Sequence, residues 1–83
     1  MAEMVIGNVS YYNGPLSMGV VDLLEPLKIG DVIHIKGLHE DFIQTIDTLE
    51  MDYTQIQYAK SGDAVGIKVA RPVCPNDRVY KLL

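Results

Sequence analysis

Apolar and polar residues alternate over short stretches of the chain, and this period-2 pattern is typical of β-strands with one buried face. The clearest stretch is residues 32–36, in which Ile33 and Ile35 are expected to point inward while His34 and Lys36 face water. An earlier stretch places Val5, Val9 and Tyr11 on one parity, and a later one does the same for Val65, Ile67 and Val69. The pattern predicts strands over residues 3–12, 18–24, 32–36, 64–69 and 78–82.

Residues 42–51 fit two structures. Phe42, Ile46 and Leu49 have the spacing of an amphipathic helix. A bulged strand with one extra residue near Thr48 explains the same side chains. The threonines and the absence of alanine favour the strand, which would be the sixth.

One turn design occurs three times, each time just before a predicted strand. It consists of Gly30-Asp31, Gly62-Asp63 and Asn76-Asp77. Gly and Asn tolerate the left-handed conformation, and an Asp side chain accepts hydrogen bonds from nearby amides, so these six residues are predicted to be structural turn locks. Six short strands separated by turns predict an all-β fold, namely a small, closed, mostly antiparallel barrel without a free edge.

Length and composition predict one domain over residues 1–83, since the chain has 83 residues, 48% of them hydrophobic and 22% charged. No apolar run approaches the roughly 20 residues that cross a bilayer, and the first residues lack the features of a signal peptide. We therefore expect a cytoplasmic protein, monomeric or weakly oligomeric, with no membrane partner. The single cysteine, Cys74, excludes an internal disulfide.

No arrangement of residues in the sequence predicts catalysis. His34 and His39 lack a third metal ligand at a fixed spacing, Cys74 lies between prolines with no helix to activate it, and the acids form no catalytic pair. We expect no catalytic residue, no metal, no cofactor and no enzymatic activity.

The charges are distributed unevenly. Residues 1–59 carry two basic and nine acidic residues (net −7), whereas residues 60–83 carry five basic and two acidic residues (net +3). Four of these bases flank the last two predicted strands and are candidates for one RNA-binding end of the barrel: Lys68, Arg71, Arg78 and Lys81. Tyr11 and Tyr12 are adjacent, so one is expected in the core and the other is a candidate for base stacking.

Residues 27–37, 46–51 and 59–67 resemble, in order and spacing, the second domain of translational GTPases such as elongation factor Tu. This resemblance implies a six-stranded Greek-key-like barrel and favours the strand over residues 42–51. The whole chain is also similar to small stand-alone translation elongation factor-like proteins. It further resembles a barrel appended to some collagenase-like peptidase-family proteins associated with RNA modification.

Two departures limit what this resemblance implies. The chain has no G-x-x-x-x-G-K-[ST] phosphate loop, which excludes nucleotide binding there and GTPase activity. Residues 7–14 lack the acids and the arginine with which elongation factor Tu holds aminoacylated tRNA. The resulting hypothesis is a non-catalytic module that contacts tRNA-like RNA or an RNA-associated protein. The alternative is a protein–protein adaptor that supplies in trans the barrel that is fused in the peptidase-family proteins.

Overall fold

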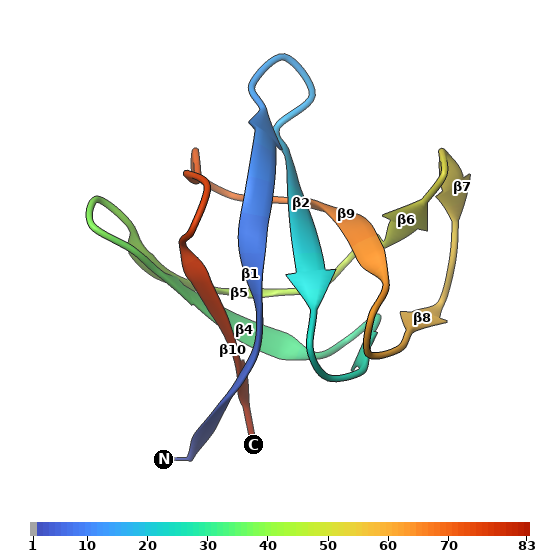
Figure 1. The fold of residues 1–83 in the computed structure, drawn as a ribbon, viewed down its shortest axis with the longest axis horizontal. Helices are drawn as coiled ribbons and strands as arrows, with labels where there is room; N and C mark the ends of the chain where they lie inside the picture. Colours follow the sequence, from blue (N-terminus) through green and yellow to red (C-terminus); the bar gives the residue numbers. More distant parts are fainter. Residues whose placement is uncertain (1) are drawn as a thin grey trace.

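The computed structural model describes residues 2–83, which form strands, turns and loops with no helix among them (Figure 1). In chain order the strands are β1 (Glu3–Asn13), β2 (Met18–Leu23), β3 (Leu27–Lys28), β4 (Val32–Lys36), β5 (Asp41–Thr45), β6 (Glu50–Met51), β7 (Thr54–Gln55), β8 (Tyr58–Ala59), β9 (Ala64–Lys68) and β10 (Arg78–Leu82). The all-β prediction is confirmed.

The strands form two sheets in which every pair is antiparallel. Eight strands follow the order β5-β4-β10-β1-β2-β9-β6-β7, and β3 pairs with β8. Figure 1 shows the larger sheet curving strongly, with β5 passing behind β1 and β2. The sheet is open, because β5 and β7 stand at opposite ends of its strand order.

The prediction of a closed six-stranded barrel is therefore wrong in its detail, because the strand pairing does not close the sheet. The single strand expected over residues 42–51 is split, because the chain leaves the ladder after Thr45 and returns only at Glu50. The returning strand, β6, has two residues, and it pairs with β9 only where Glu50 faces Gly66. Such a short strand does not provide the continuous ladder that closure requires.

The core is built from inward-facing β-branched residues and leucines, as the alternation predicts. Ile33, Ile35, Val65 and Ile67 are fully buried. In β1 the prediction that Val5, Val9 and Tyr11 share one face is wrong. Val5 and Tyr11 are exposed, and Ile6 is buried beside Val9. Two bulges in β1, at residues 5–7 and 9–11, cause the change, since each extra residue moves the following side chains to the other face.

The three recurrent turns, residues 28–31, 60–63 and 74–77, have one geometry. Gly30, Gly62 and Asn76 have φ angles of 95°, 92° and 77°. In each turn the backbone N–H of the last residue donates to the carbonyl of the first, at 3.1 Å. In each turn, too, the aspartate carboxylate accepts a hydrogen bond from the backbone N–H of the first residue, at 2.9–3.0 Å.

Each turn is also fastened to a buried residue of another segment. Turn 28–31 exchanges two backbone hydrogen bonds with Ile46, turn 60–63 with Leu23, and turn 74–77 with Val9. These contacts extend the β4–β5, β9–β2 and β10–β1 ladders by one step. The fold therefore uses the same device three times to fix where a strand begins.

Candidate functional site

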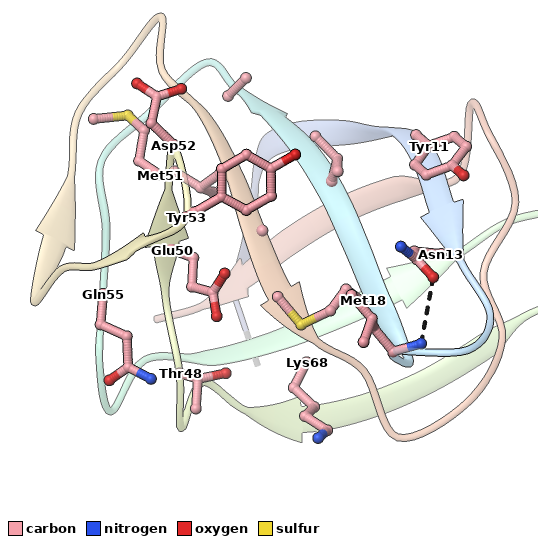
Figure 2. Close-up of a pocket in the computed structure, with 15 residues that line it drawn as sticks. Tyr11, Asn13, Met18, Thr48, Glu50, Met51, Asp52, Tyr53, Gln55 and Lys68 are labelled. Atoms are coloured by element: carbon pink, nitrogen blue, oxygen red, sulfur yellow. Dashed lines mark hydrogen bonds between the residues drawn. The ribbon is translucent and has the colours of Figure 1, made fainter.

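A groove with a volume of about 610 Å³ lies over β2 and β9, between the end of β1 and the β6–β7 hairpin (Figure 2). Its lining is Tyr11, Asn13, Leu16, Met18, Val20, Thr48, Glu50, Met51, Asp52, Tyr53, Gln55, Ala64, Val65, Gly66 and Lys68. Gly66 lies in the floor, and its lack of a side chain leaves room there for the methyl end of Met18. The groove is larger than a second hollow of about 450 Å³, which Arg78 lines together with Asn8 and Asn76.

The β6–β7 hairpin presents Tyr53 at its tip. Met51 pairs with Thr54, which leaves Asp52 and Tyr53 as a two-residue loop. Their φ angles are 53° and 63°. A loop with two positive φ angles favours Asn-Gly, and a bulky residue in the left-handed region costs on the order of 1 kcal/mol. Tyr53 is nevertheless fully exposed, at 101%, so its ring contributes no packing that offsets this cost.

The rim of the groove is apolar at several other points. Tyr11 and Leu16 are 57% and 60% exposed. Met18 is half-buried and lines the groove from β2, whereas Met51 on β6 is half-buried and packs against the core. Turn residues support Leu16, because its backbone N–H donates to Oδ1 of Asn13 at 3.3 Å. Aromatic and methionine side chains are adaptable contacts at protein-binding surfaces.

The polar lining of the groove includes three charged side chains and the hydroxyl of Thr48. Glu50 and Asp52 belong to the hairpin, and Lys68 lies at the opposite end of the groove in Figure 2. None of the three forms an ion pair with another described residue. Oγ1 of Thr48 is buried without a hydrogen-bond partner in residues 2–83. The surface thus combines apolar rims with polar groups that the fold leaves unused.

The structure brings two of the sequence-predicted binding residues together in this groove, namely Tyr11 and Lys68. Tyr12 is half-buried and packs against the core, as expected for one member of the tyrosine pair. Arg71 lies over the ring of Phe42, with its guanidinium carbon 5.7 Å from the ring centroid. Arg78 lines a second hollow with Asn8 and Asn76. The four predicted bases therefore lie in different surroundings.

Lys81 belongs to a structural ion cluster. Its ammonium donates to the carbonyl of Pro26 at 2.9 Å and lies 3.3 Å from Oδ2 of Asp31. Asp31 is buried and also accepts hydrogen bonds from the side chain and the backbone of Lys28. Burial acts to raise the pKa of Asp31, but the hydrogen bonds from Lys28 and Lys81 outweigh it and hold that pKa below its ordinary value.

His34 connects three strands on another part of the surface. Its Nδ1 lies 2.9 Å from Oε2 of Glu3, and its Nε2 contacts Oδ1 of Asp41. The hydrogen bond to Asp41, followed by that to Glu3, raises the pKa of His34 above its ordinary value. The same contact lowers the pKa of Asp41. The protonated imidazole therefore fastens β1, β4 and β5 to one another.

Within residues 2–83 no three His, Cys, Asp or Glu side chains gather as a metal site. Cys74 is exposed at the first position of its turn. The described part of the chain also has no helix with the length and hydrophobicity needed to span a membrane.

The sequence does not predict that Leu16, Met18 and Tyr53 belong to one site. The position of Tyr53 depends on a hairpin that reverses direction at Asp52-Tyr53. No turn signal such as Asn-Gly marks that position. Leu16 and Met18 are far from Tyr53 in sequence and line the same groove only through the pairing of β2, β9 and β6.

Two comparisons with known proteins find similar chains. The chain is 32% identical over 81 residues, or 96% of its length, to a protein of Methanocaldococcus jannaschii named "uncharacterized protease". It spans about a fifth of the length of this curated relative, 20%. No family model matches the chain.

Among solved structures, the C-terminal domain of a "putative U32 peptidase" of Geobacillus thermoleovorans superposes with a TM-score of 0.88. The superposition covers 96% of this chain and 93% of that domain, at 24% identity. The selenomethionine variant of the same domain gives 0.86, with 90% and 95% covered and 24% identity. The chain therefore has the same fold as this C-terminal domain.

This result corrects the expected relationship. The comparisons point to the C-terminal domain of a U32 peptidase, so the prediction of a translation factor resembling elongation factor Tu is wrong. The peptidase-family context of the alternative hypothesis is supported. The prediction was wrong because the Gly-Asp pairs before hydrophobic strands are required by the turn geometry. Such a pair therefore does not distinguish one protein family from another.

Proposed function

We propose that this chain is a non-catalytic adaptor that supplies in trans a β-domain that peptidase-family proteins carry within a longer chain. The observation behind the proposal is the superposition on a peptidase C-terminal domain, which covers nearly the whole of both chains. The fold corresponds to one part of such a protein, and the relative from Methanocaldococcus jannaschii is about five times as long as the matched region.

The absence of a recognisable reaction centre from residues 2–83 favours binding over catalysis. The histidine with two carboxylate partners, His34, has its ring nitrogens engaged by Glu3 and Asp41. The buried aspartates Asp31 and Asp77 hold turns. The groove below Tyr53 has the apolar rims and free polar groups of a binding surface. The adaptor is proposed to act in the cytoplasm.

Affinity purification from the native cell tests this proposal. The tagged chain is recovered from one lysate divided into RNase-treated and untreated halves, and the bound proteins are identified by mass spectrometry. If the chain is such an adaptor, a peptidase-family protein should be recovered in equal amount from the RNase-treated and the untreated half. Recovery without any peptidase-family protein, or loss of that protein after RNase treatment, contradicts direct binding in trans.

A further inference from the structure

We infer that the groove below Tyr53 is the docking surface for the peptidase-family partner, and that its occupant is an apolar segment of that protein carrying a lysine or arginine. This inference rests on the proposed function and adds to it the surface and the chemistry of the contact. Three independent features of the groove support it.

The first feature is the conformation of the hairpin tip. Tyr53 has a φ angle of 63° and is fully exposed. Glycine at this position would satisfy the turn without strain, and the tyrosine ring packs against nothing that offsets the strain. A strained residue whose side chain does not stabilise its own fold is suited to a contact outside the chain. Aromatic side chains are enriched in such contacts because they bury a large area on binding.

The second feature is the apolar surface around Tyr53. Tyr11 and Leu16 project from the opposite rim, each more than half exposed, while Met18 lies between the rims. Together with Tyr53 they come from three separate segments of the chain. An apolar segment laid in the groove removes these side chains from water at once, which is the main favourable contribution to association.

The third feature is the charge of the groove. Glu50 and Asp52 lie on the hairpin, and Lys68 is the one base in the lining, so carboxylates outnumber cations. Neither carboxylate has an ion-pair partner in the described residues. A lysine or arginine of the occupant would pair with them. A second copy of this chain is disfavoured, because a two-fold contact through this groove brings four carboxylates together with only two lysines.

Binding of the full-length peptidase-family protein recovered above, measured by biolayer interferometry, tests the surface. Tyr53→Gly should weaken binding at least tenfold while leaving the thermal midpoint unchanged or higher, because glycine accepts the left-handed angle. Tyr58→Thr is the matched control, since Tyr58 is 65% exposed but lies on β8, outside the groove. It should bind within twofold of the wild type.

Glu50→Lys tests the charge. It should weaken binding at least tenfold, and Glu50→Gln should weaken it less and flatten its salt dependence. Binding of Tyr53→Gly and Glu50→Lys within twofold of the wild type would overturn the docking surface and leave the adaptor function in place. A wild-type chain that recovers no peptidase-family protein overturns both. Light scattering that shows a dimer dissociated by Tyr53→Gly assigns the groove to a second copy and overturns the stated occupant.

Discussion

The side-chain carbonyl of Gln44 accepts a hydrogen bond from the backbone N–H of Ala70 at 2.8 Å. The amide nitrogen of the same side chain donates to the carbonyl of Lys68, also at 2.8 Å. One side chain on β5 thus pairs with the backbone at the end of β9 as a neighbouring strand would. Because the sheet has no strand pairing between β5 and β9, Gln44 is a bridge across its open side.

Gln44→Glu should destabilise the protein by about 1–2 kcal/mol, since a carboxylate still accepts from Ala70 but faces the carbonyl of Lys68 without a donor. Urea denaturation measures the loss. Hydrogen exchange of the Ala70 amide should accelerate in Gln44→Ala, in which its acceptor is absent. Thr45→Ala, at the next and exposed position of β5, is the control. Equal stability of Gln44→Glu and wild type would show that the bridge contributes nothing.

Gly62→Val should cost more than about 1 kcal/mol of unfolding free energy, because Gly62 has a φ angle of 92° and a β-branched residue is strained there. A β-carbon at this position meets no atom within 4 Å, so the cost comes from the backbone conformation. Gly14→Val tests exposure alone, because Gly14 is exposed and its φ angle is not positive. An unchanged denaturation midpoint for Gly62→Val would contradict the turn geometry.

Gly37→Ala should be destabilising for a different reason. A β-carbon at Gly37 would overlap the carboxylate of Asp77, which is buried and accepts a hydrogen bond from the backbone of Cys74. Overfilling of this kind costs about 1–3 kcal/mol. In the Asp77→Ala background the same substitution should cost less, because the overlapping atoms are gone. A double-mutant cycle by thermal denaturation measures the coupling, and additive effects would show that the two residues do not interact.

The contribution of His34 to stability should decrease as pH rises. Its pKa is raised in the folded state, so the imidazolium contacts with Asp41 and Glu3 act fully below its ordinary value of 6.5. They are lost as pH increases through the raised folded value. Thermal midpoints between pH 5 and 9 should fall across this window in the wild type. Two other groups face this site. The ring centroid of Tyr80 lies 6.2 Å from that of His34, and the charge of Lys36 helps to lower the pKa of Asp41.

His34→Gln should remove this decrease, and His39→Gln should retain it, because His39 is exposed in the β4–β5 loop. A wild-type midpoint that rises between neutral and alkaline pH would contradict the assigned role of His34.

The sequence predicts local features of this fold well and contacts between distant residues poorly. The strand Val32–Lys36 is evident because alternation is a property of adjacent residues. The turns at Gly30, Gly62 and Asn76 are evident because few residues tolerate their backbone angles. The ion pair between Lys81 and Asp31 is not evident from the sequence. The two residues are 50 positions apart and meet only because β10 pairs with β4.

The groove could not be predicted for a related reason. Tyr53 violates the residue preference of its own turn, so local rules point away from the conformation that it adopts. The split of residues 42–51 into β5 and β6 depends equally on long-range contacts, because Ile46 still bonds with Gly30 and Asp31 at the end of the β4–β5 ladder whereas Glu50 pairs with Gly66 of β9. Where a local preference and a tertiary contact disagree, the contact decides the structure.

The three four-residue turns share one backbone geometry, so the residue at the first position of one turn should be replaceable by the residue found there in another. Cys74 occupies the position that Lys28 and Lys60 hold in the other two, and its side chain is exposed. The turn uses the backbone N–H of this residue and not its thiol. A cysteine-free protein with Lys at position 74 should consequently keep the fold, and a new thiol introduced at the tip of the β6–β7 hairpin would then be a unique attachment point for a fluorophore or cross-linker.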